Sequence, residues 1–422
     1  MEDDKEQTLR TRPPPQNEVG NASLYVREPL IQGLTFFAVS LSCVLYEVMG
    51  SHSFLLSKLK KIPVGAAVLF VYSGRALWSF LLRKIAEGRT LQMELKENTD
   101  LTGKFIVLTG GTSGIGKACA IQLVQWGATV IIGCRDIEKG TRALAEIANA
   151  SGNENSSKLL SVYPLDLSEL ASVKKFAEQV LSLNVGINFL INNAGVMLPG
   201  GQVELSKDGY EQQFATNHLS HFLLTLLLLN NVKKNNGRII TLASLAHSSV
   251  DSKKVSTNSS HYEMFAYQCV IFSCKSVVRT LFDFDSVVEP LARNTNQTFK
   301  YYSISKLCNI WFTAELQRRL SLDSSTTATA YCCHPGVVRT DLFRDRGKFL
   351  AVLFKIVGHF FLKSAESGAA TQLHLCAAPL ESLYPGLYYD NCRPGLVTRA
   401  AVNPLKEQEL WKLSERLVAN YL

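Results

Sequence analysis

The feature that most constrains the fold is a glycine-rich turn at residues 109–116, where the chain reads Thr-Gly-Gly-Thr-Ser-Gly-Ile-Gly. A short apolar run precedes the turn, and a helical pattern follows it from Lys117. Glycines in such a turn let the backbone approach a pyrophosphate, and the first N–H groups of the helix are free to bind the anion. The pattern therefore predicts a strand–turn–helix unit that binds a dinucleotide. The predicted contacts come from Gly110, Thr112, Ser113, Gly114, Ile115 and Gly116.

From about residue 101 onward, short apolar runs alternate with amphipathic segments. Strand–helix alternation at this spacing is typical of βαβ units. We therefore expect an α/β fold, a Rossmann-type doubly wound parallel sheet with helices on both faces. The segment 405–422 should form a helix that packs on the core, because Leu410, Leu413, Leu417 and Tyr421 share one face. The expected strands are Phe105–Thr109, Thr129–Cys134, 159–165, Phe189–Asn192, Arg238–Leu242 and Thr329–His334.

The N-terminal region differs from the rest of the 422-residue chain. Residues 1–29 are polar and charged, and we expect a disordered tail. An uncharged apolar run follows at 30–46, and a second at 62–82 is interrupted only by Arg75. The first run is long enough to span a bilayer, whereas the second can span it or lie at its surface. We expect a membrane anchor of one or two helices at 30–86 and a linker at 87–100. The alternative is a helix buried against the domain.

The charge distribution and the cysteine content limit the classes of binding partner that the chain is expected to have. The net charge is +8, and the densest basic cluster, at 58–89, adjoins the apolar runs. This placement favours binding to membrane lipid. Nucleic acid is not an expected partner, because the sequence shows no basic face with interleaved aromatic residues. The ten cysteines are scattered without the Cys/His spacing of a zinc site, so we expect no metal.

A tyrosine and a lysine, Tyr302 and Lys306, are four residues apart in a helical segment. Residues at this spacing share one helix face. Reduction of a carbonyl by hydride needs a proton donor, but a free tyrosine has a pKa of about 10. A neighbouring lysine is expected to lower that pKa. Ser244, at the end of an expected strand, can donate a hydrogen bond to the substrate oxygen.

With these motifs in this order, residues 101–399 resemble the short-chain dehydrogenase/reductase family. Segments 206–210, 244–247 and 306–309 are similar to its retinol-dehydrogenase-like branch, which includes the WW-domain oxidoreductase and the X-chromosome-encoded dehydrogenase/reductase. No WW domain is visible here. The resemblance implies an adenine contact from Asp166 and a catalytic set of Asn217, Ser244, Tyr302 and Lys306, in which Asn217 holds a water. It also implies cofactor contacts from Asn193, Ala194, Gly195, Tyr302, Lys306, Pro335, Gly336 and Thr340.

The choice of cofactor depends on the end of the second expected strand and the residues that follow it, Gly133 to Asp136. Cys134 stands where NAD-specific members of that family carry an acidic residue. Arg135 can instead pair with the 2′-phosphate of NADP(H). We expect NADP(H) to be preferred, with NAD(H) as the alternative. A simpler interpretation is that Arg135 lies in a surface loop and Asp136 caps the next helix.

The resemblance implies an enzyme in a domain at 101–422. It would interconvert a lipophilic alcohol, such as a retinoid, polyprenoid or sterol, and its aldehyde or ketone with NADP(H). We expect attachment to the endoplasmic reticulum membrane, a cytosolic catalytic domain, and allow for a homodimer. A catalytically silent nucleotide-binding signalling or scaffold protein is the alternative.

The stretch between Ser244 and Tyr302 is longer than usual in the family. The additional residues, at 267–299, have three open interpretations: a substrate lid, an extra membrane contact, or a segment wrongly retained in a gene prediction.

Overall fold

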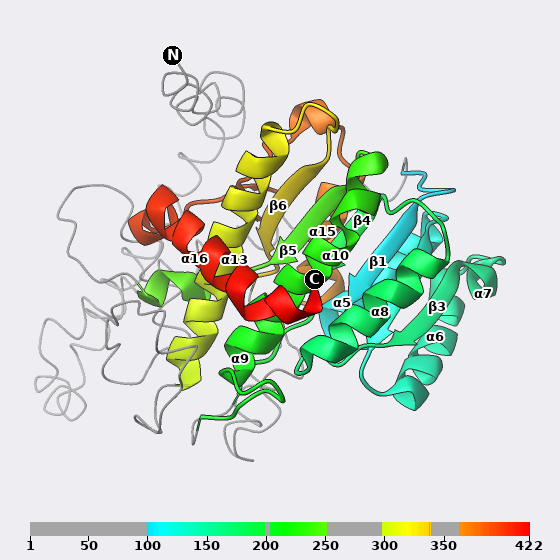
Figure 1. Cartoon of the computed structure of the whole chain (residues 1–422). Coiled ribbons are helices and arrows are strands. Elements are labelled where there is room, and N and C mark those ends of the chain that lie inside the picture. The colour runs from blue at the N-terminus through cyan, green and yellow to red at the C-terminus, as the bar shows by residue number, and fades with distance from the viewer. Residues whose placement is uncertain (1–98, 199–202, 251–297, 337, 339–362) are drawn as a thin grey trace, which may run out of the picture. The chain divides into compact units, whose positions relative to one another are not determined.

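Seven parallel strands form the centre of the described structure, and a short antiparallel strand closes one edge. The computed structural model describes residues 99–198, 203–250, 298–336, 338 and 363–422 (Figure 1). The predicted tail at 1–29, the anchor region at 30–86, Thr340 and nearly all of the linker and of the 267–299 insertion lie outside the described residues.

The strand order, β3-β2-β1-β4-β5-β6-β7-β8, confirms the predicted doubly wound sheet. The chain builds outward from β1 to β3 and then crosses back to β4, so the order reverses between β1 and β4. In open α/β sheets, ligands bind outside the carboxyl ends of the strands at such a reversal. The strands are β1 (Phe105–Thr109), β2 (Thr129–Cys134), β3 (Leu160–Pro164), β4 (Phe189–Asn192), β5 (Arg238–Leu242), β6 (Thr329–His334), β7 (Tyr388–Asp390) and β8 (Arg393–Pro394).

Both faces of the sheet are buried under helices, which explains why its strands are nearly continuous apolar runs. Successive side chains of β1 enter different clusters: Val107 faces one core, and Ile106 and Leu108 face the other. The first core is covered by α8 (Leu170–Ser182), α10 (Ser220–Lys234), α13 (Thr298–Ser321) and α16 (Pro404–Val418), which Figure 1 shows over one face. The second is covered by α5 (Gly114–Gln125), α6 (Ile137–Ser151) and α15 (Ala365–Ala377).

The C-terminal helix α16 packs on the core, as its apolar face predicts. Leu410 and Trp411 are buried, and the Trp411 ring centroid lies 5.0 Å from that of Phe222 on α10 and 6.0 Å from that of Phe312 on α13. The helix ends at Val418 and a single 3₁₀ turn, η6 (Ala419–Tyr421), follows it.

Some boundaries differ from those expected. Helix α5 begins at Gly114 rather than Lys117, so the last residues of the glycine turn are already helical. The strand expected at 159–165 is one residue shorter at each end: Leu159 ends the short helix α7 (Ser156–Leu159), and β3 ends at Pro164. Thr298 and Phe299, assigned to the insertion, already belong to α13. Strands β7 and β8 were not predicted, since they are too short to show a period.

The remaining short elements are α9 (Gln212–Phe214), a π-helical turn η1 (Ala215–Leu219), and the 3₁₀ turns η2 (Leu245–Val250), η4 (Leu380–Ser382) and η5 (Arg399–Ala401). The seven cysteines of the described residues are buried and free. Within the described ranges, no helix combines the length and the hydropathy that crossing a bilayer requires. The two apolar runs at 30–46 and 62–82 lie outside those ranges.

A buried carboxyl group, Glu211, caps α9 and gives the fold a testable pH dependence. Its Oε2 accepts a hydrogen bond of 2.7 Å from the Phe214 N–H. Burial raises the pKa of Glu211 to about 7, although hydrogen bonds from Phe214 and Gln213 oppose the rise. An unfolded glutamate has a pKa of about 4.3, so between these values the folded state holds a proton that the unfolded chain has lost. Stability should therefore fall as pH rises through this window.

We expect Glu211→Gln to remove this loss, because a neutral amide oxygen can still accept from Phe214. At pH 8 the variant should have a free energy of unfolding up to about 3 kcal/mol above wild type, and the gap should close toward pH 5. Chemical denaturation across this range measures it. Glu315→Gln is the matched control: burial disfavours the Glu315 charge, but Arg318 and Arg319 outweigh burial and lower its pKa. This variant should be destabilised at pH 8. A difference in free energy of unfolding between Glu211→Gln and wild type that does not change with pH would contradict this explanation.

Candidate active site

The glycine turn between β1 and α5 has no room for side chains at two positions. Gly110 has a left-handed φ of +68°, and a Cβ there would lie 2.9 Å from the Ala194 Cα atom. A Cβ on Gly116 would lie 2.2 Å from the carbonyl oxygen of Gly110. The turn is therefore packed directly on the segment after β4. Gly114 also has positive φ, and the side chain of Ile115 lies toward Gly368 of α15, so Ile115 offers a ligand only its backbone.

Thr109, the last residue of β1, holds this edge of the sheet together. Its hydroxyl oxygen accepts hydrogen bonds of 3.0 Å from the N–H groups of both Asn193 and Ala194. The Asn193 side chain donates back to the Thr109 carbonyl oxygen at 2.8 Å. The sequence assigned Asn193 and Ala194 to this edge but missed Thr109. A threonine at the carboxyl end of the first strand was the available signal.

A cavity of about 310 Å³ lies at the carboxyl ends of β1 to β4. Five predicted cofactor residues line it, whereas the lining residues Lys139, Gln212 and Thr216 were not predicted. Asp136 caps α6 by accepting from the Lys139 N–H at 3.0 Å, as the simpler interpretation of this loop proposed. Arg135 is nevertheless exposed at the cavity. The five predicted residues are Gly110, Thr112, Arg135, Asp166 and Ala194.

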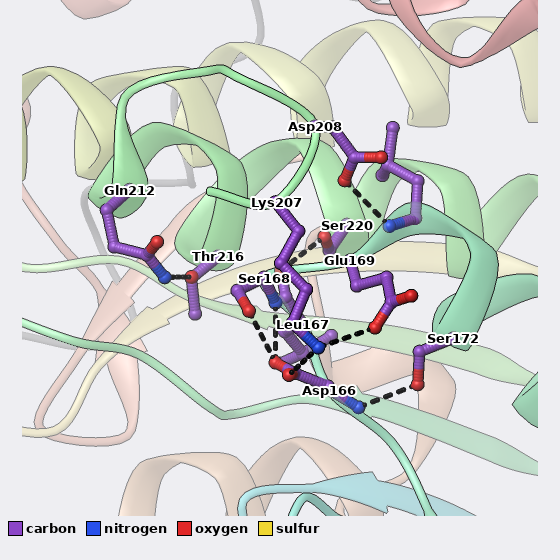
Figure 2. Close-up of polar contacts among 11 residues, drawn as sticks. Asp166, Leu167, Ser168, Glu169, Ser172, Lys207, Asp208, Gln212, Thr216 and Ser220 are labelled. Carbon is purple, nitrogen blue, oxygen red and sulfur yellow. Dashed lines mark hydrogen bonds and ion pairs between the residues drawn. The ribbon is translucent and has the colours of Figure 1, made fainter. Parts of the chain in front are cut away.

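Asp166 is fixed in this cavity by several neighbours, shown in Figure 2. Its Oδ1 accepts from the Ser168 N–H at 3.0 Å and the Ser168 hydroxyl at 2.7 Å. The Lys207 ammonium lies 3.1 Å from Asp166 Oδ2 and 2.7 Å from Glu169 Oε2 (Figure 2). Partial burial works against the Asp166 charge, but Ser168 and Lys207 outweigh it and lower the pKa of this carboxyl group. Lys207 was not among the predicted site residues.

Asn217 lies in the π-helical turn η1, a geometry frequent at functional sites. Its side chain accepts from the Val196 N–H at 2.7 Å and donates to the Val196 oxygen at 2.9 Å and the Ser305 hydroxyl at 3.0 Å. Its main-chain oxygen accepts from both His221 Nδ1, at 3.1 Å, and Asn309 Nδ2, at 3.0 Å. This main-chain oxygen is therefore shared by two buried donors.

Tyr302 and Lys306 lie on one face of α13, and both are buried. The Lys306 ammonium donates to the Leu242 carbonyl oxygen at 3.0 Å and lies 5.7 Å from the Tyr302 ring centroid. Burial lowers the pKa of Lys306 to about 8. Burial also raises the pKa of Tyr302, and a hydrogen bond with Ser244 offsets part of the rise. The expected net lowering is wrong for this structure, because desolvation dominates and keeps the pKa of Tyr302 above its ordinary value.

The other predicted residues lie in three places around the site. A Cβ on Gly195 would lie 3.2 Å from Asn217 Oδ1 and 3.3 Å from Lys306 Nζ, so this glycine joins the cofactor edge to the catalytic set. Pro335 and Gly336 follow β6, where Gly336 has φ of +85° and approaches the Lys363 side chain. Ser113 precedes α5 in an extended conformation. No cluster of three or more potential metal ligands occurs among the described residues.

Comparisons with known proteins agree with this arrangement. A family model described as short chain dehydrogenase matches residues 104–260. Retinol dehydrogenase 12 of Mus musculus is 35% identical over 326 residues, covering 76% of this chain and 88% of the relative. The chain belongs to the short-chain dehydrogenase/reductase family. Retinol dehydrogenase 14 of Mus musculus is 34% identical over 363 residues, covering 84% of this chain and 97% of that protein.

Relatives in this family extend beyond animals. Short-chain dehydrogenase TIC 32 B, chloroplastic, of Brassica napus is 35% identical over 326 residues, covering 74% of this chain and 88% of the relative. Among solved structures, an uncharacterized protein from Mycobacterium paratuberculosis superposes with a TM-score of 0.56 and 28% identity, covering 77% of this chain and 97% of that one. As a retinol-dehydrogenase-like member of the short-chain dehydrogenase/reductase family, the chain is an NAD(P)-dependent oxidoreductase that acts on CH–OH groups.

Proposed function

We propose that the chain is a membrane-associated oxidoreductase that interconverts a lipophilic alcohol and its aldehyde or ketone by hydride transfer with NADP(H). The observation that carries this proposal is the meeting of Ser244, Tyr302 and Lys306 beside the cofactor edge of the sheet. Tyr302 is hydrogen-bonded to Ser244, and Gly195 lies against Lys306. Because the whole set is present, turnover is favoured over the alternative of a silent nucleotide-binding scaffold.

The residues present fit a nicotinamide dinucleotide. With glycine at 110 and 116 the turn carries no side chains at these positions, so its backbone can approach a pyrophosphate, and the start of helix α5 behind it offers free N–H groups. Asp166 is held as a carboxylate at the cavity and can accept from the adenine amino group. Arg135 and Lys139 place positive charge there, which suits a 2′-phosphate. When bound, the cofactor supplies or accepts the hydride.

The catalytic residues divide the proton chemistry between them. In reduction, the Ser244 hydroxyl donates a hydrogen bond to the carbonyl oxygen of the substrate, and Tyr302 transfers its phenolic proton to that oxygen. The raised pKa of Tyr302 keeps the proton on the phenol at neutral pH, so the acid is present before reaction. Lys306, with a pKa of about 8, is mostly charged at pH 7 and stabilises the phenolate that forms. In oxidation the same phenolate takes the proton from the alcohol.

A lipophilic substrate is proposed on two grounds. Relatives include retinol dehydrogenases 12 and 14, so retinoids are the first class to test, before polyprenoids and sterols. The apolar runs at 349–354 and 360–362, which lie outside the described residues, follow the Pro335–Gly336 segment and suit a lipid chain.

Tyr302→Phe should abolish turnover, because no other group can transfer the proton from that position. A loss on the order of 10² to 10⁴ in kcat is expected, while the Kd of NADPH stays close to wild type. Steady-state rates on a panel of lipid alcohols and aldehydes, together with fluorescence titration of NADPH, measure both quantities. Tyr301→Phe is the matched control, since Tyr301 is also buried on α13, and it should retain activity. Substantial residual turnover by Tyr302→Phe would reject the assignment.

Cys134→Asp should shift the cofactor preference toward NADH. A carboxylate at the end of β2 would repel a 2′-phosphate and accept from a 2′-hydroxyl, so the NADPH/NADH ratio of kcat/KM should fall about 10-fold or more. Cys134→Asn has almost the same shape without the charge and should leave the ratio near that of wild type. An equal ratio in the Asp and Asn variants would show that this loop does not set the preference.

We also propose that the residues before 99 attach the enzyme to the endoplasmic reticulum membrane, with the catalytic domain in the cytosol. The apolar run at 30–46 and the basic residues at 58–89 support this, since each basic residue near an anionic leaflet adds about 1 kcal/mol of attraction. Arg75 makes a second span the costlier option. Full-length protein should stay with membranes in alkaline carbonate, whereas a protein starting at residue 99 should be released. Release of the full-length protein would reject the anchor.

A further inference from the structure

A chain of buried hydrogen bonds joins the cofactor edge of the sheet to Lys306. At its centre is the main-chain oxygen of Asn217, which accepts from His221 on one side and Asn309 on the other. Beyond His221 lies the Thr109 hydroxyl, 2.8 Å from His221 Nε2. Beyond Asn309 lies the Leu242 carbonyl oxygen, 2.9 Å from Asn309 Nδ2, which also accepts from Lys306.

The proton positions along this chain follow from which atoms can only accept. The Asn217 oxygen has no proton, so His221 Nδ1 must donate to it. His221 is neutral, because burial lowers its pKa to about 4, and its Nε2 must therefore accept from the Thr109 hydroxyl. Thr109 in turn uses its oxygen to accept from Asn193 and Ala194. The two ring nitrogens of His221 and the Thr109 hydroxyl are thus all satisfied in a single arrangement.

The orientation of the Asn309 amide follows in the same way. Its Nδ2 lies within 3.0 Å of the Asn217 and Leu242 oxygens, neither of which can donate, so the amide nitrogen must face them. Its Oδ1 faces His218 Nδ1 at 3.3 Å, and His218 Nε2 is 3.1 Å from the Ser414 hydroxyl on α16. Asn309 thus gives one amide proton to each carbonyl and accepts on its opposite side.

We propose that Asn309 is a positioning residue for the Tyr302/Lys306 pair. It fixes the carbonyls of Asn217 and Leu242 relative to each other, and it occupies one of the two acceptor positions that Leu242 could offer to Lys306. The inference rests on the proposed function and adds to it a residue that touches neither substrate nor cofactor. Asn309 is three residues after Lys306 on α13. Its hydrogen bond to the Leu242 carbonyl oxygen places its side chain on the side of this helix that faces the sheet.

Two effects of Asn309 on Lys306 have the same sign. Asn309 competes for the electron density of the Leu242 oxygen, and the positive end of its N–H dipole lies on the side of the ammonium. Both make the charged form of Lys306 less favourable. Removing the amide should therefore hold the proton on Lys306 to higher pH.

The other titratable groups near Lys306 are neutral at physiological pH, so they do not mask the effect of Asn309 on the pKa of Lys306. They are Tyr302 on its own helix, Cys332, Cys333 and His334 on β6, and His221 on α10. Burial raises the pKa of both thiols and lowers the pKa of both imidazoles. Among the described groups coupled to Lys306, none is a carboxylate.

The test is the pH profile of kcat/KM for Asn309→Leu in the full-length enzyme with saturating NADPH. The apparent pKa that Lys306 contributes to this profile should rise by about 0.5 to 1 pKa unit, the shift expected from one competing hydrogen bond. The Kd of NADPH should change less than kcat. Ser414→Ala is the matched control, because it breaks a buried hydrogen bond of the same network without touching Leu242. It should lower thermal stability and leave the profile in place.

If Asn309→Leu does not fold, Asn309→Ala replaces it with the same expected shift. An unmoved or lowered apparent pKa in the folded variant would overturn the proposal, as would an equal shift in Ser414→Ala. Loss of turnover in Tyr302→Phe, combined with an unmoved profile in Asn309→Leu, would reject this inference alone. Retained turnover in Tyr302→Phe would reject the proposed function on which it rests.

Discussion

The burial of one ammonium group, that of Lys306, is the constraint on which the arrangement of the site depends. A charged lysine loses several kcal/mol of hydration on entering a protein interior, and only well-placed acceptors can offset this cost. The carbonyl oxygen of Leu242, at the end of β5, is the acceptor. Because α13 must bring Lys306 to the carboxyl end of β5, it also brings Tyr302 to Ser244, which follows β5 two residues later. The acid/base pair is therefore positioned by the same contact that makes its burial tolerable.

The cofactor edge is tied to this contact through groups that carry no charge. Thr109, at the end of β1, links the residues after β4 to His221 on α10, and the π-helical turn before α10 presents the Asn217 carbonyl to His221 and Asn309. Strands β1, β4 and β5 are neighbours in the sheet, so their carboxyl ends form one continuous edge. Hydride and proton transfer at one carbon need such a common edge, since the two partners must approach the substrate together.

Much of the fold could be predicted from the sequence, because strands buried on both faces appear as apolar runs. Five of the six expected strands have the predicted limits, and the glycine turn lies where the strand order reverses. The contacts that orient the site could not be predicted in this way. His221 and Asn309 on helices and Lys207 in a turn act through partners distant in the sequence, and a polar residue in such a place carries no local sign of its partner. The pKa of Tyr302 was mispredicted for a related reason: helical spacing places Lys306 nearby, but only the fold shows that desolvation of the phenol dominates.

The central claim is that this site transfers a hydride between a nicotinamide ring and the carbinol carbon of a lipophilic alcohol. The most direct test is a single turnover of the purified enzyme with retinal and NADPH that carries deuterium at the transferable position of the nicotinamide ring. The account predicts that the alcohol formed carries one deuterium on its carbinol carbon, as mass spectrometry would show. Oxidation of the cofactor without deuterium in the alcohol, or no reaction with retinal, polyprenal or sterol carbonyl compounds, would contradict it.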